Sequence, residues 1–409
     1  MSVLVSIAGL AFLILIHEAG HFFTARAVGM KPRRFYIGFP PAVLKTTRNG
    51  IEYGLGAIPL GGYVKIPGMH RPAPSDVDVH FGPALYESPR LLPEVERVKR
   101  GIAQGDFEGA RAALKELEHA IEQAPLSANA KRSAARGLDD LADALGSDAY
   151  WRQRTWKRLA VIAAGPGTNL LFAIALLAAV YMIGIPSDAS RRVGDVIPKS
   201  PAATAGLHPG DVIVGVNRVP TYDFKDVRDA IRSSGGKPLV ISVVRNGRYV
   251  ELAPARPQST DGVYTLGFHP SAVKYKRYDP VHAVGLAGKD TWLVTKAMGS
   301  WLTHVVSGSG RKEVSTPVGI VRQSSKAVQV GYREYLQVLA LNSLSLALLN
   351  LLPLLPLDGG HMAFSIIEGL RGRAVGRVVY ERVSAVGIAL VLLLFFVGLS
   401  NDIGSIRGG

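Results

Sequence analysis

The chain has 409 residues, of which 48% are hydrophobic, and its mean hydropathy is +0.19. It is too apolar for an ordinary water-soluble enzyme and too mixed for a bundle made only of membrane spans, which predicts a few transmembrane helices with water-facing parts. With no cysteine, disulfides and any zinc site built on cysteine are excluded. A net charge of +15 suits either a nucleic-acid binder or a membrane protein with basic cytoplasmic loops. Because Lys and Arg are spread among Ala, Gly and Pro, we expect a lipid bilayer and no nucleic acid as the partner.

The first predicted span, residues 1–28, carries the sequence HEAGH at residues 17–21 in its inner half. On a helix, His17 and His21 share one face and could bind one metal ion, while Glu18 could take a proton from a water molecule beside it. This is the H-E-x-x-H pattern of zinc proteases. A cleaved signal peptide is the alternative, but the chain starts without basic residues and cleavage would discard the motif. Basic residues then place this end of the span in the cytoplasm: Arg26, Lys31, Arg33 and Arg34.

Residues 35–66 alternate Tyr and Ile with Gly, which predicts a β-hairpin with a turn at Pro59, Gly61 and Gly62. The hairpin has little else to pair with, so a strand edge should stay exposed. Beside a protease site, an extended substrate could add to that edge through main-chain hydrogen bonds. Gly61, Gly62 and Tyr63 are therefore candidate substrate-binding residues, with an ordinary surface hairpin as the alternative.

Two segments of different character follow. Residues 68–90 are rich in proline and are expected to be irregular, whereas residues 91–147 repeat apolar residues at helical spacing. We therefore expect a small cytoplasmic helical hairpin at 91–147, without chemistry of its own.

A second span, residues 156–185, begins with aromatic and basic residues typical of a cytoplasmic interface. Asn169 within it is either a hydrogen-bonding group between helices or a substrate contact.

Residues 191–257 are predicted to form a compact water-facing part with helices and strands. Ser200 and Asp223 are helix N-caps, and Asn246-Gly247 marks a β-hairpin. A helix beside an exposed strand would offer a groove for a peptide, especially a chain end. Residues 280–332 are too interrupted by Gly and Lys for a confident span, and we expect a connecting segment that could lie on the membrane surface.

The third predicted span, residues 335–370, is broken by the prolines and glycines of residues 350–361. A break at membrane depth is tolerated only where the backbone lines a site buried in protein. Basic residues after the break mark a return to the cytoplasm, and a fourth span covers residues 383–399.

Asp358 lies in this break, where a carboxylate is costly unless it is paired or bound to metal. We expect it to join His17 and His21 as the third ligand, leaving the fourth tetrahedral position of a catalytic zinc site for water. A helix-turn cap is the alternative for Asp358, and His361 is a rival ligand. Asn350 could donate a hydrogen bond to a developing oxyanion or to the substrate backbone.

These motifs together resemble the site-2 protease family of zinc intramembrane metalloproteases. HEAGH matches its H-E-x-x-H, and residues 350–359 match its N-x-x-P-x-P-x-L-D-G, except that Leu355 stands where the family often has proline. Residues 59–63 resemble its membrane re-entrant hairpin, and residues 164–169 resemble the motif of its second span. Residues 191–257 look like a PDZ domain, as in the single-PDZ form of the bacterial regulator of sigma-E protease-like branch.

The resemblance implies a polytopic α-helical membrane protein with about four transmembrane helices, a re-entrant β-hairpin at 35–66 and an extracytoplasmic PDZ domain at 191–257. The cytoplasmic insert at 91–147 matches no part of the family pattern and is expected from its helical spacing alone. The resemblance also implies one Zn²⁺ per chain, a location in the bacterial inner membrane and an active site toward the cytoplasmic half. The expected activity is cleavage of single-pass membrane proteins, such as anti-sigma factors, within their transmembrane segment. An upstream site-1-type protease would first trim the same substrate.

Two other functions compete with this one. A non-catalytic membrane scaffold could bind chain ends through the PDZ domain, but the intact Glu18 argues against a dead metal site. A metal-handling membrane protein would line a path with further carboxylates inside the membrane, and the sequence offers one clear ligand set.

Overall fold

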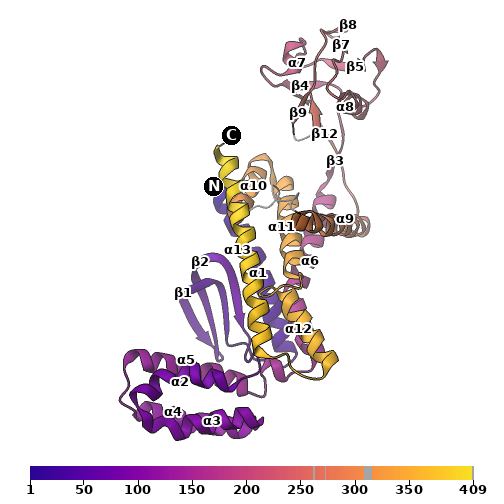
Figure 1. The fold of residues 1–409 in the computed structure, drawn as a ribbon. Helices are drawn as coiled ribbons and strands as arrows, with labels where there is room; N and C mark the ends of the chain where they lie inside the picture. Colours follow the sequence, from indigo (N-terminus) through magenta and orange to yellow (C-terminus); the bar gives the residue numbers. More distant parts are fainter. Residues whose placement is uncertain (261–262, 272, 308–315, 408–409) are drawn as a thin grey trace. The chain divides into compact units, whose positions relative to one another are not determined.

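The structure, a computed structural model, describes residues 1–260, 263–271, 273–307 and 316–407. It divides into two compact units, which are described separately below (Figure 1). Unit 1 comprises Met1–Leu176 and Gly288–Gly409, and unit 2 comprises Leu177–Ala287.

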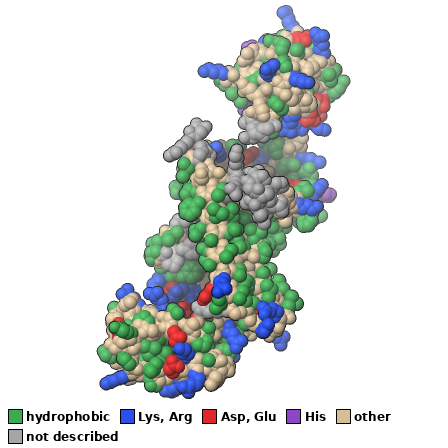
Figure 2. Space-filling model, in the orientation of Figure 1, with side chains coloured by type: hydrophobic (Ala, Val, Ile, Leu, Met, Phe, Trp, Pro, Cys, Tyr) green, Lys and Arg blue, Asp and Glu red, His purple; other side chains and the backbone are tan. Residues whose placement is uncertain are grey.

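Long apolar helices dominate unit 1. Among the described residues, three helices are long and apolar enough to cross a membrane: α1 (Ser2–Ala27), α6 (Thr155–Ile183) and the stretch Val378–Ile403 of α13 (Arg377–Arg407). Each exceeds the roughly 20 residues that a bilayer requires. On the face seen in Figure 2, hydrophobic side chains cover the helices of this unit, and Lys and Arg gather at the end that carries the helical insert.

The remaining helices bear on two expectations. The third predicted span, 335–370, is two helices, α11 (Tyr332–Asn350) and α12 (Asp358–Arg371), and neither is apolar and long enough to count as a span. Length and composition thus identify three candidate spans, and the expected number of about four stays a prediction. The segment predicted to be interrupted contains one continuous 28-residue helix, α9 (Pro280–Ser307), followed by α10 (Pro317–Val330). Isolated glycines weakened the helical pattern, yet each costs a helix only about 1 kcal/mol.

A curled antiparallel sheet packs against α1. Strands β1 (Arg34–Arg48) and β2 (Ile51–Lys65) are joined at Asn49-Gly50, whose φ angles of 52° and 73° suit the tight turn that this dipeptide favours. The predicted turn at Pro59, Gly61 and Gly62 is therefore wrong. These residues belong to β2, because Asn-Gly supplies the left-handed conformations that the turn requires.

The sheet is more than a simple hairpin. Phe35 of β1 pairs with both Tyr53 and Val64 of β2, so β2 bends around the first half of β1. Residues 58–65 consequently form an edge strand whose described pairing partner is β1 alone. The edge expected from the sequence is present, and it is the one that carries Gly61, Gly62 and Tyr63.

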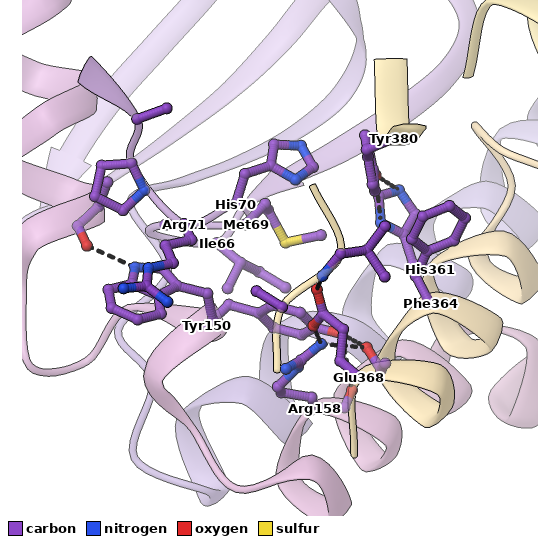
Figure 3. Close-up of a pocket in the computed structure, with 18 of the residues that line it drawn as sticks. Ile66, Met69, His70, Arg71, Tyr150, Arg158, His361, Phe364, Glu368 and Tyr380 are labelled. Atoms are coloured by element: carbon purple, nitrogen blue, oxygen red, sulfur yellow. Dashed lines mark hydrogen bonds and ion pairs between the residues drawn. The ribbon is translucent and has the colours of Figure 1, made fainter. Parts of the chain in front are cut away.

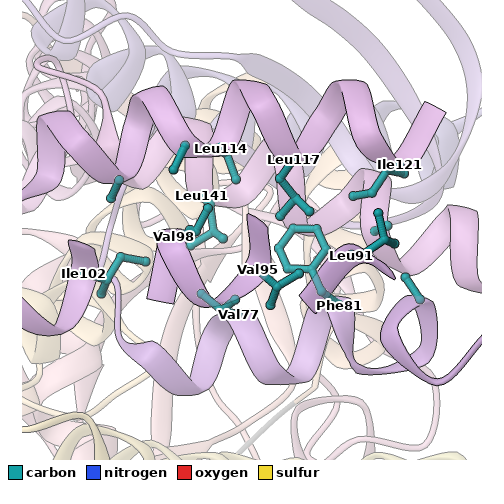
Figure 4. Close-up of a cluster of buried hydrophobic side chains, with 14 of the residues drawn as sticks. Val77, Phe81, Leu91, Val95, Val98, Ile102, Leu114, Leu117, Ile121 and Leu141 are labelled. Carbon is teal, nitrogen blue, oxygen red and sulfur yellow. The ribbon is translucent and has the colours of Figure 1, made fainter. Parts of the chain in front are cut away.

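The helical insert is larger than predicted, because residues 68–90 are not irregular. Pro74 starts a helix at its first position, where the missing N–H of proline has no helical partner to lose. The insert has its own hydrophobic core, with Phe81, Val95 and Leu117 at its centre (Figure 4). Its helices are α2 (Pro74–Glu87), α3 (Leu92–Gln104), α4 (Phe107–Gln123) and α5 (Ala128–Leu145), with short 3₁₀ turns at Pro89–Leu91 and Tyr150–Arg152.

Unit 2 is an α+β body around a four-stranded antiparallel sheet of order β6-β5-β7-β8. Ser200 and Asp223 cap its two short helices as predicted, and the hairpin turns at Asn246-Gly247. In its core the buried Asp211 accepts two hydrogen bonds from Arg245. The helices are α7 (Pro201–Thr204) and α8 (Phe224–Ser233). The sheet strands are β5 (Val212–Val216), β6 (Val219–Pro220), β7 (Ile241–Arg245) and β8 (Arg248–Glu251).

Short two-stranded ladders complete unit 2. The pairs are β3 (Ile185–Ala189) with β12 (Val273–Lys276), β4 (Val193–Val196) with β11 (Phe268–Pro270), and β9 (Gln258–Thr260) with β10 (Val263–Thr265). These elements are compatible with the predicted PDZ domain, which stays a prediction.

Candidate metal centre

Three side chains from two distant parts of the sequence lie close together inside unit 1. His17 and His21 lie one turn apart on the same face of α1, and Asp358 is the first residue of α12. Their Nε2 and Oδ2 atoms form a nearly equilateral triangle: His17 to Asp358 is 3.1 Å, His21 to Asp358 is 3.3 Å, and His17 to His21 is 3.3 Å. Among the described residues, these three form the group of His and carboxylate side chains able to hold a metal ion.

The triangle fits zinc. Bonds of about 2.0–2.1 Å in a tetrahedral zinc site place neighbouring ligand atoms about 3.3 Å apart. The other ring nitrogen of His21, Nδ1, is 2.8 Å from the main-chain oxygen of Val161 and so donates its proton there, which leaves Nε2 unprotonated on the neutral ring. The Asp358 Oδ2 is buried without a hydrogen-bond partner in the described part of the chain. A cation between these atoms would satisfy lone pairs that otherwise face one another.

One face of α6 backs the two histidines. Val161, Gly165 and Asn169 are spaced four residues apart on this helix, and each contacts His17 or His21. Sequence analysis singled out Asn169, placed Gly165 only within the motif at 164–169 and missed Val161, although four-residue spacing puts all three on one face.

Asn169 is fully buried, with its Nδ2 3.4 Å from Nδ1 of His17. Its Oδ1 has no hydrogen-bond partner among the described residues. Rotating the amide by 180° would place Oδ1 against the Nδ1–H of His17, and the two orientations are alike in shape. The main-chain oxygen of Asn169 accepts a hydrogen bond of 2.8 Å from Ser343 of α11. Asn169 thus lies behind His17 and links helices, an arrangement compatible with the first of its two predicted roles, which stays a prediction.

Glu18 faces the sheet edge. Its carboxylate interacts electrostatically with His17, His21 and Asp358 and accepts a hydrogen bond from the main chain of Val64 in β2. A Cβ added to Gly62 would lie 2.9 Å from the Cγ of Glu18. The edge strand therefore passes directly over Glu18, and only a residue without a side chain fits there.

The other predicted site residues have partners outside the triangle. Tyr63 stacks on Tyr36 within the sheet, with ring centroids 5.2 Å apart. The amide of Asn350 donates to the main chain of Leu346, 3.0 Å away in its own helix. The rival ligand His361 is 3.0 Å from the hydroxyl of Tyr380 and stands outside the metal-binding group.

Close packing of α1 on α6 depends on glycine. A Cβ at Gly165 would overlap Nε2 of His21, and a Cβ at Gly20 would lie 2.5 Å from the main-chain oxygen of Ala164. Gly165→Ala should therefore displace His21 and strip the protein of zinc. Gly167→Ala is the matched control, because a Cβ at Gly167 has no neighbour within 4 Å. Metal analysis of the two purified variants checks this, and full zinc content in Gly165→Ala would contradict the assignment of His21.

The known proteins that this chain resembles are peptidases. The sequence profile described as Peptidase family M50 matches residues 5–394. A Rhizobium meliloti protein whose name includes the words zinc metalloprotease is 29% identical over 413 residues, covering 98% of this chain and 95% of the relative. The Regulator of sigma-W protease RasP of Bacillus subtilis is 27% identical over 418 residues, covering 96% and 95%. The Zinc metalloprotease RasP of Bacillus licheniformis is 26% identical over 412 residues, covering 96% of both chains.

Proposed function

Because the chain belongs to peptidase family M50 and is a zinc metalloprotease of the site-2 type, we propose that His17, His21 and Asp358 hold its zinc ion and that Glu18 is the catalytic base. The observation that carries this proposal is the triangle of donor atoms 3.1–3.3 Å apart. Glu18 follows His17 directly, on a helix long and apolar enough to cross a membrane.

When bound, zinc supplies Lewis-acid chemistry that acidifies water and polarises a peptide carbonyl. Glu18 takes the proton from the attacking water and returns it to the departing amine. Val64 holds the Glu18 carboxylate through a main-chain hydrogen bond, so the base is oriented before the substrate arrives. Asn169 fixes the ring of His17 from behind, which makes it a positioning residue rather than a substrate contact.

The substrate binds as an added strand along residues 58–65. Its main chain would pair with the edge that carries Gly61, Gly62 and Tyr63, which brings one peptide bond over Glu18. A helical transmembrane segment must unwind to do this, because only extended backbone can pair with a strand. Asn350 would reach a substrate carbonyl after releasing Leu346.

The substrates are single-pass membrane proteins of the anti-sigma-factor kind, cut within their transmembrane segment after an upstream protease has trimmed them. The support is the name of the relative from Bacillus subtilis, which describes a regulator of a sigma factor. In this arrangement the basic ends of α1 and α6 lie in the cytoplasm with the insert, and unit 2 is an extracytoplasmic PDZ domain.

Cleavage in lipid vesicles tests the proposal. The purified protein is reconstituted with a single-pass substrate that lacks its extracytoplasmic domain, and mass spectrometry identifies the new chain ends. We expect one cut inside the apolar segment, lost on zinc chelation and restored by added zinc. Cuts confined to the water-exposed flanks, or cleavage that survives chelation, would contradict an intramembrane zinc enzyme.

A further inference from the structure

A large chamber adjoins the metal centre within unit 1. Its volume is about 1300 Å³, above the roughly 300–1,000 Å³ of a pocket for a small ligand (Figure 3). Its walls come from the end of β2, the insert, the start of α6, and helices α12 and α13.

The chamber reaches close neighbours of the catalytic residues. Val64 lines it and also hydrogen-bonds Glu18 through its main chain. His361 lines it as well and lies one helical turn after Asp358 on α12. A chain that crosses the metal centre along the edge strand would therefore continue into the chamber.

The insert is a fixed wall of this chamber. Asp143 of α5 pairs with Arg33 at 2.7 Å and with Lys65 at 3.1 Å, which ties the insert to the base of the sheet. The indole N–H of Trp151 donates a hydrogen bond of 2.8 Å to the main-chain oxygen of Ala144. The main-chain N–H of Trp151 donates one of 3.1 Å to the main-chain oxygen of Gly68. Because the insert has a core of its own and several anchors, it holds the chamber open rather than closing over it as a lid.

The lining suits a polypeptide. Tyr380 packs on His70 with ring centroids 4.4 Å apart and hydrogen-bonds His361 (Figure 3). Arg158 is held by Ser365 and by Glu368. These aromatic rings and polar groups contact one another, and such a mixed lining suits main chain together with side chains of several kinds.

On both α12 and α13, the residues that line the chamber recur at helical spacing. On α13, Tyr380, Ser384 and Ile388 recur at four-residue spacing along the chamber. On α12, His361 and Ser365 do the same. The chamber also lies at the end of unit 1 where the Lys and Arg side chains gather, which the positive-inside rule assigns to the cytoplasm (Figure 2).

We propose that this chamber receives the extended cytoplasmic flank of the substrate while the substrate's transmembrane segment lies at the metal centre, an inference that rests on the proposed function. The insert gives the chamber its outer wall and so restricts entry to an unfolded chain.

Cross-linking tests occupancy, and the lack of native cysteine makes every introduced thiol unique. Ser384→Cys places a thiol in the chamber, and Ala112→Cys places one on the exposed face of α4 as a control. Both are combined with Glu18→Gln so that the substrate stays intact. We expect a short bifunctional maleimide to join Ser384→Cys to cysteines in the cytoplasmic flank of the substrate, and not to cysteines in its opposite flank. Cross-linking no stronger than that of Ala112→Cys would overturn the proposal.

Filling the chamber provides a second test. Ala385→Trp should slow cleavage of a long-flanked substrate about tenfold because the indole takes up room in the chamber, and leave a substrate without that flank unaffected. Val386→Trp, next along the helix and exposed like Ala385 but outside the lining, should slow neither substrate. Equal slowing of both substrates by Ala385→Trp would refute the proposal. The unaltered protein is assayed in the same vesicles: if it cleaves neither substrate, the proposed function fails and not only the role of the chamber.

Discussion

Glu18→Gln should leave zinc bound and reduce cleavage by about 10²–10⁴-fold, the usual contribution of a general base. The amide keeps the shape of the side chain but cannot accept a proton. Because Glu18 is outside the ligand triangle, the metal should remain. Product formation in vesicles and zinc content of the same sample provide the two measurements.

A shorter carboxylate sharpens this test. Glu18→Asp keeps the base but withdraws it by one methylene from the position that Val64 and Gly62 define. We expect activity between that of the unaltered protein and that of Glu18→Gln, because proton transfer depends on hydrogen-bond reach. Unchanged cleavage in Glu18→Gln would show that another group is the base.

Asp358→Asn should abolish both zinc binding and cleavage. The neutral amide is a weak ligand and no longer offsets the charge of the cation, while the two histidines remain. Metal analysis after dialysis against a weak chelator measures the loss.

His361→Ala is the matched control for Asp358→Asn, because it removes the rival ligand from the same helix one turn away. It should retain zinc, since His361 is bonded to Tyr380 and stands apart from the triangle. Zinc retained in Asp358→Asn but lost in His361→Ala would reverse the assignment of the third ligand.

The sequence predicted the parts of the site that depend on local spacing. His17 and His21 share a helix face by periodicity alone, and the proline-glycine break before α12 marked Asp358 as a buried carboxylate with a special partner. Local spacing could not predict that Asp358 lies beside His17 and His21, because the contact between α12 and α1 depends on the tertiary fold. That prediction required the two distant motifs to be interpreted together.

Other features were beyond local rules. Gly165 matters because of the ring of His21 on another helix, and Gly62 because of Glu18, so neither role is visible within its own segment. The predicted turn at Pro59 was wrong because a strand edge tolerates proline and glycine, while Asn49-Gly50 was the stronger turn signal. Residues 68–90 are expected to be irregular because they are rich in proline, yet Pro74 begins a helix.

The most direct measurement of the central claim is an anomalous difference map at the zinc absorption edge from crystals of the full chain in lipid. The account predicts a peak bonded to Nε2 of His17, Nε2 of His21 and a carboxylate oxygen of Asp358, with Glu18 beside it and not bonded. A peak elsewhere, or one bonded to the histidines with Asp358 turned away, would contradict it.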